Sequence, residues 1–125
     1  MESRKSILVT GVAGFIGFHL VKLLSNSHKV TGLDNLNDYY NTDLKIERLN
    51  QLGIKYDKKS SYFRSHYYSL EFFKLDLNDK ELLTDLFRKK NFDIVIHLAA
   101  QAGVRYSFEN PEAFINSNIK GFFNI

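Results

Sequence analysis

The sequence predicts an α/β fold: a doubly wound parallel sheet in a three-layer αβα arrangement. Two observations predict it. Three short apolar runs rich in Val, Ile and Leu, at residues 6–10, 29–34 and 93–100, are typical of parallel strands buried on both faces. Helical patterns separate these runs, and strands that alternate with helices pair in parallel through right-handed crossovers. The chain has 125 residues, 44% of them hydrophobic, which suits one domain.

A fourth strand is predicted at residues 70–76; like 29–34, it ends on an aspartate. Residues 35–69 interrupt the alternation of strands and helices. They contain a helix predicted from Thr42 to Gln51, which Gly53 would stop, and then a polar, aromatic stretch at 54–69 to which we assign no element.

Apolar spacing and end signals predict three more helices. In the first, which follows the first strand, four apolar residues fall on one face, namely Ile16, Leu20, Leu23 and Leu24. The second covers residues 78–90, with Asn78 and Glu81 as a capping box and basic residues in its last turn.

The last helix has Asn110 as its N-cap and Pro111 at its first position. Apolar residues then line one face, namely Ile115, Ile119 and Phe122. No cap residue closes this pattern before Ile125. We therefore expect residues 1–125 to be the N-terminal part of a longer, truncated protein.

Composition excludes several classes of function. The chain has no cysteine, and therefore no disulfide or thiolate site. Neither an apolar run of membrane-spanning length nor a signal peptide is present, so we expect a cytoplasmic protein and no membrane partner.

His97 ends an apolar run and is interpreted as a core histidine, and His19 as structural or at the surface, so no metal site is expected. The net charge of +3 comes from dispersed basic residues, which does not favour a nucleic-acid partner.

Three glycines follow the first strand and open the helix after it: Gly11, Gly14 and Gly17. The first allows a sharp turn, the second leaves room for an anion, and the third lets the helix pack close to the strand. Free N–H groups at such a helix start suit a pyrophosphate. Asp34, at the end of the next predicted strand, suits ribose hydroxyls and repels a 2′-phosphate. This Rossmann-type arrangement favours NAD over NADP.

The chain resembles the extended short-chain dehydrogenase/reductase family in five stretches, namely TGVAGFIGFHL, GLDNLNDYY, LDLND, HLAAQAGVRYS and NPEAFINSNIKGFFNI. Within that family it is most similar to the nucleotide-sugar epimerases of the UDP-glucuronate 4-epimerase type, through the combination of DNLNDYY with AGVRYS. The glycine motif itself is common to many dehydratases and reductases of the family.

The resemblance implies an NAD site at the carboxyl ends of the strands. The implied contacts are Gly11, Gly14, Phe15, Ile16 and Gly17 for the pyrophosphate, Asp34 and Asn35 for the adenosine ribose, Asp76 and Leu77 for adenine, and Leu98, Ala99 and Ala100 on the nicotinamide side.

The resemblance also implies a reaction and its partners. A Tyr-x-x-x-Lys pair and a Ser or Thr carry the chemistry in such enzymes, with transient hydride transfer from the sugar C4 to NAD. None of the seven tyrosines here has a lysine four residues later. We therefore expect no catalytic residue in this chain. The intact enzyme would act on a UDP-sugar as a homodimer, and the catalytic and substrate portion would be absent here.

Several positions allow two interpretations. Asp34 and Asp76 also suit simple turn residues. Arg105 would contact the phosphate or carboxylate of the substrate, or form a surface ion pair. Ser117 and Asn118 would reach toward the cofactor or occupy a helix face. The aromatic residues of 54–69 suit packing better than base stacking.

Alternative functions stay open from the sequence. A sugar-nucleotide 4,6-dehydratase or decarboxylase shares the same fold, and a dehydratase would carry an acid pair beside its catalytic tyrosine. A non-catalytic NAD-binding module would bind without turnover. Nucleic-acid binding through the basic insertion would depend strongly on salt.

Overall fold

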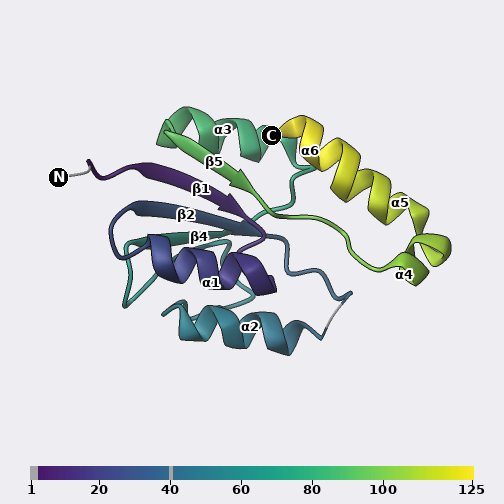
Figure 1. Ribbon diagram of the computed structural model, residues 1–125, viewed down its shortest axis with the longest axis horizontal. Coiled ribbons are helices and arrows are strands. Elements are labelled where there is room, and N and C mark those ends of the chain that lie inside the picture. Colours follow the sequence, from purple (N-terminus) through teal and green to yellow (C-terminus); the bar gives the residue numbers. More distant parts are fainter. Residues whose placement is uncertain (1–2, 40) are drawn as a thin grey trace.

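The computed structural model describes residues 3–39 and 41–125, and it confirms the doubly wound parallel sheet. Within these residues the sheet has five strands in the order β3-β4-β2-β1-β5 (Figure 1). The strands are β1 (Ser6–Thr10), β2 (Lys29–Asp34), β3 (Tyr62–Arg64), β4 (Leu70–Lys74) and β5 (Ile94–His97). All neighbours pair in parallel except β3, which runs antiparallel to β4.

Helices cover both faces of the sheet (Figure 1). On one face lie α1 (Phe15–Leu24) and α2 (Thr42–Gln51), and on the other lie α3 (Lys80–Lys90) and α6 (Gly121–Asn124). Beyond the carboxyl ends of the strands run α4 (Val104–Glu109) and α5 (Pro111–Phe114). The predicted three layers are therefore present.

The core is divided by the sheet into two apolar layers, because successive strand residues point to opposite faces. Leu8 and Leu33 pack with Leu83 and Leu86 of α3. The other layer joins β1, β2 and β4 to α1 and α2, through Ile7, Val9, Val30, Phe72, Phe18, Val21 and Leu49. These layers hold the strand ends in place, and the site forms there.

The buried face of α1 differs from the predicted one. Gly17, Phe18 and Val21 are its buried residues, whereas Ile16 and Leu23 are 65% and 68% exposed. The physical reason is Gly17. Because it has no side chain, the helix packs against the strand-to-helix turn through the side that carries Gly17, and not through the side that carries Ile16 and Leu23. Leu20 and Leu24 flank the packed side and are partly buried.

The apolar run 93–100 predicts a strand buried on both faces, and this prediction is wrong in extent and in burial. Only Ile94–His97 pair with β1, and Ile94 and Val95 are exposed. β5 lies at the edge of the sheet in the described residues, so one side of it has no neighbouring strand. Residues 98–100 leave the sheet and enter the site described below. β4 likewise ends at Lys74, before Asp76.

Of the two N-cap residues predicted from the sequence, one is wrong and one is confirmed. Asp79, not Asn78, caps α3, and its side chain accepts a hydrogen bond from the Leu82 N–H at 3.2 Å. Asn78 instead donates to Asp76 and to the Asn116 carbonyl. The predicted cap of the last helix is confirmed, because the Asn110 side chain accepts from the Ala113 N–H ahead of a helix that begins with Pro111.

The C-terminal helix is not regular as predicted. A π-helical turn, η1 (Ile115–Lys120), separates α5 from α6, which shifts the register of the apolar residues. Ile115, Ile119 and Phe122 are exposed. Neither β3 nor α4 was predicted, since the surrounding sequence has no clear apolar period. No helix in the described part of the chain is long and apolar enough to cross a membrane.

Candidate functional site

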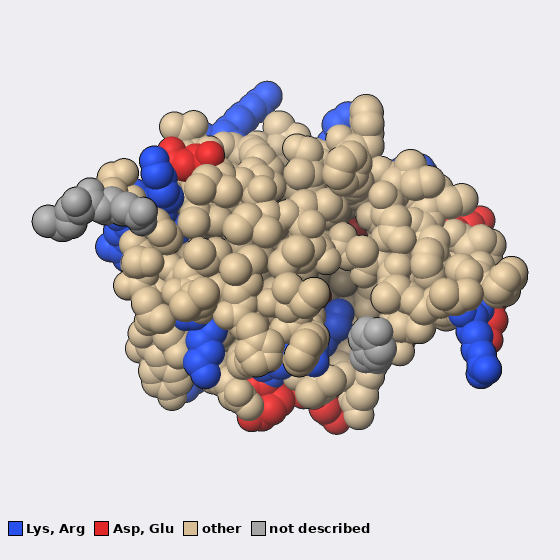
Figure 2. Space-filling model, in the orientation of Figure 1, with Lys and Arg blue, Asp and Glu red and all other residues tan. Residues whose placement is uncertain are grey.

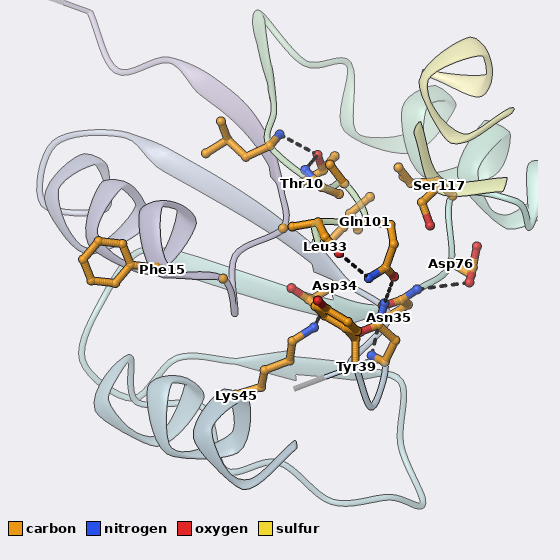
Figure 3. A pocket seen from close by; sticks show the side chains of 18 of the residues that line it. Thr10, Phe15, Leu33, Asp34, Asn35, Tyr39, Lys45, Asp76, Gln101 and Ser117 are labelled. Atoms are coloured by element: carbon orange, nitrogen blue, oxygen red, sulfur yellow. Dashed lines mark hydrogen bonds and ion pairs between the residues drawn. The ribbon is translucent and has the colours of Figure 1, made fainter. Parts of the chain in front are cut away.

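The largest concentration of predicted site residues lies at the carboxyl ends of the strands. There β2 and β5 flank β1 and connect to helices on opposite faces, which is the point where doubly wound sheets bind ligands. A cavity of about 400 Å³ opens here, within the usual size range of small-molecule sites (Figure 3). The residues that line it come from the ends of β1, β2, β4 and β5 and from α1 and α2.

The glycine turn has the geometry that its sequence predicts. Gly11 has a φ of +78°, the left-handed region that favours glycine, and its N–H donates to the Leu33 carbonyl at 2.7 Å. A Cβ on Gly17 would lie 2.1 Å from the Gly11 carbonyl oxygen, so only glycine fits this close contact between helix and turn. The turn is thereby held against β2.

The first turn of α1 faces the cavity through its N-cap, Gly14. Gly14 has no side chain to cap the helix, and the first turn contains no acidic residue. The first N–H groups of a helix have no partner within it and carry the positive end of the helix dipole. An anion such as a pyrophosphate therefore suits this end of the cavity.

Asp34 ends β2 and is buried among donors. One carboxylate oxygen accepts from the Ala13 N–H at 3.1 Å, and the other accepts from the Leu36 N–H at 2.8 Å. The Lys45 ammonium of α2 approaches the same carboxylate at 3.4 Å (Figure 3). Asp34 thus stabilises the turn that follows β2, as the turn-residue interpretation expects. Its carboxylate also lines the cavity and has further lone pairs that can accept hydrogen bonds from a ligand.

α2 contributes two cations that the sequence analysis missed. Lys45 and Arg48 lie three residues apart on the helix and both line the cavity. The Arg48 guanidinium donates to the Ala13 carbonyl at 2.9 Å and so ties the glycine turn to α2. Their spacing on one helix face was the available signal, but only the fold places that face beside Asp34.

Asp76 and Asn35 meet across the end of the sheet, from the turns that follow β4 and β2. The Asn35 amide donates to the Asp76 carboxylate at 3.2 Å (Figure 3). The same carboxylate accepts from the Asn78 N–H at 2.9 Å, which is a turn-forming bond. Asp76 therefore shapes its turn and also lines the cavity, so both interpretations of this residue are compatible with the structure.

Thr10 and His97 hold the segment that lines the far side of the cavity. The Thr10 hydroxyl oxygen accepts from the N–H groups of Leu98 and Ala99, each at 3.0 Å. Its own proton is then available for His97 Nδ1, 2.6 Å away, which must be unprotonated. Burial lowers the pKa of His97, which favours this neutral form. His97 is thus the satisfied histidine that the sequence predicts.

Most predicted site residues share one cavity. Those that line it are Gly11, Gly14, Phe15, Asp34, Asn35, Asp76, Leu77, Leu98, Ala99 and Ala100. Gly17 is buried behind the turn, and Ile16 is exposed outside the lining. Arg105 is exposed on α4 and lines neither this cavity nor the neighbouring one.

Lining residues absent from the prediction include Tyr39 and Gln101. The Asn118 side chain accepts from the Gln101 N–H at 2.7 Å and donates to its carbonyl at 3.1 Å, so its role is to fix this loop. Ser117 lines the cavity. Among the residues that the structure describes, no group of three His, Cys, Asp or Glu is placed to hold a metal ion.

A parallel sheet whose first strand leads through a glycine turn into a helix, with an acid at the end of the second strand, defines a Rossmann-type dinucleotide-binding fold. The sequence matches the profile of the GDP-mannose 4,6 dehydratase family over residues 8–125. The chain therefore belongs to that family.

Individual relatives are epimerases. The chain is 44% identical over 119 residues to the UDP-glucuronate 4-epimerase of Thermodesulfobacterium geofontis, covering 94% of this chain and 33% of that protein. It is 45% identical over 121 residues to UDP-glucuronate 4-epimerase 4 of Arabidopsis thaliana, covering 96% of this chain and 25% of the relative.

A solved structure shows the same fold. The UDP-glucuronic acid 4-epimerase of Bacillus cereus, crystallised with UDP-glucuronic acid and NAD, superposes with a TM-score of 0.74 at 29% identity. The match covers 95% of this chain and 34% of that one. The chain thus spans a quarter to a third of the length of these relatives.

Proposed function

We propose that this chain is the NAD-binding portion of a nucleotide-sugar 4-epimerase whose substrate is UDP-glucuronate. The observation that carries the proposal is the cavity at the strand ends, where the glycine turn, the uncapped start of α1 and Asp34 come together. The relatives at about 45% identity, which are UDP-glucuronate 4-epimerases, support the choice of substrate.

The donors and the space in this cavity fit the parts of NAD. Gly14 and the first N–H groups of α1 suit the pyrophosphate, because no side chain caps this helix start and its first turn has no acidic residue. Asp34 suits the ribose hydroxyls, since a carboxylate accepts several hydrogen bonds. Asn35, Asp76 and Leu77 suit adenine, and residues 98–100 suit the nicotinamide side. These assignments agree with the roles that the resemblance implies.

When bound, NAD supplies a reversible hydride acceptor for C4 of the sugar. The residues of this chain bind and orient; they do not transfer protons, because none of its tyrosines belongs to a Tyr-x-x-x-Lys pair. We therefore expect these 125 residues to bind NAD without epimerising any UDP-sugar. Measurable turnover of UDP-glucuronate by the purified chain would contradict the proposal that these residues bind the cofactor but carry no catalytic group.

Calorimetry of NAD binding tests the proposal directly. Asp34→Ala should weaken binding by about 1–3 kcal/mol, the size of a lost set of hydrogen bonds to a charged group. Asp85→Ala is the matched control, because Asp85 is exposed on α3 and outside the cavity. An unchanged dissociation constant for Asp34→Ala would remove this residue from the site. Absence of NAD binding by the unsubstituted chain would contradict the proposed function.

A 4,6-dehydratase of the same fold is the second candidate, favoured by the name of the matching family. Reading the gene beyond residue 125 separates the two, because a dehydratase carries an acid pair beside its catalytic tyrosine. Nucleic-acid binding is less well supported. On the face shown in Figure 2, Lys and Arg side chains are dispersed among uncharged residues and form no continuous basic surface.

The intact protein is proposed to be a cytoplasmic homodimer. Exposed apolar residues on the C-terminal helices, including Ile119 and Phe123, offer a surface that a second subunit could cover. Arg105 remains a proposed contact of the substrate's phosphate or carboxylate. Its exposure on α4 leaves it accessible to a ligand that extends beyond the cavity.

A further inference from the structure

Two loops meet across the carboxyl end of β1. One loop follows β2 and carries Asn37 and Tyr39, and the other follows β5 and carries Gln101 and Gly103. β1 lies between β2 and β5 in the sheet, so a contact between these loops spans the point where the glycine turn leaves β1. We call these four residues the interloop bridge. The resemblance assigns a role to none of them.

The two loops contact each other through two pairs of residues. Gly103 has a φ of +104°, and a Cβ on it would lie only 1.9 Å from the Tyr39 hydroxyl oxygen, so this close approach requires glycine. The Tyr39 ring also packs against that of Tyr106 on α4, with 4.6 Å between the ring centroids. Alongside, the Asn37 amide donates to the Gln101 side-chain oxygen at 3.4 Å.

Each loop is held in place by contacts outside the interloop bridge. In the first loop, Leu36 is buried in the apolar layer beneath α1 and α2, and the Asn37 N–H donates to the Asn35 side chain at 3.1 Å. In the second loop, Asn118 binds both the N–H and the carbonyl of Gln101. The interloop bridge therefore joins two anchored loops, and its opening requires its own contacts to break.

The interloop bridge also forms part of the wall between two cavities. Asn37, Tyr39 and Gln101 line the cavity of about 400 Å³ and also a neighbouring cavity of about 640 Å³. The proposed NAD site runs from Asp34 after β2 to residues 98–100 after β5. It therefore extends in the same direction as the interloop bridge, from one loop to the other.

We propose that the interloop bridge closes over the bound dinucleotide and acts as a barrier to both its entry and its release. This inference rests on the proposed NAD site. Tyr39 supplies the largest side chain of the bridge, and Gly103 leaves the space that its hydroxyl group occupies. When the contact between them opens, the two cavities join and the ligand has a path out.

Stopped-flow mixing with NADH, whose reduced nicotinamide fluoresces, tests this proposal, and displacement of bound NADH by excess NAD gives the dissociation rate. Tyr39→Ala should raise the association and the dissociation rate constants together, each by roughly tenfold, because loss of a barrier speeds passage in both directions. Loss of an ordinary ligand contact would speed dissociation alone. Tyr67→Ala is the matched control and should keep the native rates, because Tyr67 is exposed and lines neither cavity.

Gly103→Ala opens the interloop bridge from the other loop, because its Cβ displaces the Tyr39 hydroxyl group. It should also raise both rate constants. If the strained φ prevents this variant from folding, Tyr39→Ala still decides the question. The inference would be overturned if Tyr39→Ala kept the native rates, or if only its dissociation became faster. Either result in a chain that binds NADH contradicts this inference alone, whereas an unsubstituted chain that binds neither NADH nor NAD contradicts the proposed function as well.

Discussion

Two glycines, three residues apart in one turn, tolerate a methyl group very differently. A Cβ on Gly17 would lie 2.1 Å from the Gly11 carbonyl oxygen, and the atoms next to it are also backbone. A Cβ on Gly14 would approach the same oxygen only to 3.1 Å, and Gly14 has an extended backbone open to any residue. Gly17 therefore allows α1 to pack closely on the glycine turn, whereas Gly14 leaves the N-terminus of α1 open to a ligand.

Gly17→Ala should lower the free energy of unfolding by roughly 1–3 kcal/mol or more, since backbone cannot yield as a flexible side chain does. Gly14→Ala should cost about 1 kcal/mol or less, because alanine is merely a poorer N-cap than glycine. It should nevertheless weaken NAD binding. Urea denaturation and calorimetry of both variants check this, and equal losses of stability would contradict the assigned roles.

His97 should make stability depend on pH. Burial lowers its pKa in the folded state below the ordinary value of 6.5, so the unfolded chain binds more protons at mildly acidic pH. The stability from the neutral ring is complete above 6.5 and is lost as pH falls through the folded pKa. Protonation would also break the bond from Thr10 to Nδ1.

Urea midpoints measured between pH 8 and pH 5 check this effect, with values chosen to span roughly the ordinary pKa of histidine. His97→Asn should flatten the acid side of the curve, because its side-chain oxygen can accept from Thr10 without titrating. His66→Gln, at an exposed position, is the control and should keep the native slope. A native slope in His97→Asn would assign the effect to other groups.

Among the elements, α3 shows how a helix start is decided by local geometry. The capping-box pattern predicts Asn78, yet Asp79 provides the cap and Asn78 reaches the C-terminal helix through the Asn116 carbonyl. Both residue types make good caps, so the sequence alone allows either. The turn at Asp76, which binds the Asn78 N–H, places Asp79 at the helix start.

Asp79→Ala should therefore destabilise the protein by about 1 kcal/mol, the usual cost of a lost N-cap. Asp79→Ser should cost much less, because a serine hydroxyl caps nearly as well. The midpoint of urea denaturation, at an unchanged m value, measures both. An equal loss in the two variants would show that Asp79 acts through its charge on the helix dipole rather than through the capping bond.

At the scale of the whole molecule, one end is apolar and uncovered. Val104, Phe108, Ile119 and Phe123 on the C-terminal helices are each more than 60% exposed. Large apolar side chains exposed to this degree are candidates for contact with another protein surface.

The 125-residue chain should therefore self-associate as its concentration rises. Sedimentation velocity should show an increasing average mass. Ile119→Lys combined with Phe123→Lys should keep the chain monomeric. Leu23→Lys is the control, because Leu23 is equally exposed but lies on α1, across the sheet. A monomer at all concentrations, or suppression by the control as well, would contradict this prediction.

Patterns local in the sequence were sufficient to predict most of the fold. Apolar runs predicted β1, β2, β4 and β5, the last two with ends placed too far along the chain, and the N-cap Asn110 with Pro111 was visible as a short motif. The short β3 and α4 were not predicted from the sequence, because neither a three-residue edge strand nor a helix without buried residues shows a periodic pattern of apolar residues. Similarly, the buried face of α1 depended on a contact with Gly11, which lies outside that helix.

The sequence by itself determined the glycine turn and the acid at the end of β2, on which the proposed class of ligand rests, since these features depend on residues close together in the chain. Only the tertiary structure decided what surrounds Asp34. Lys45 and Arg48 come from a separate helix, and their meeting with Ala13 and Asp34 results from packing α2 against the core. Spacing along a helix says which residues share a face, but not what that face contacts.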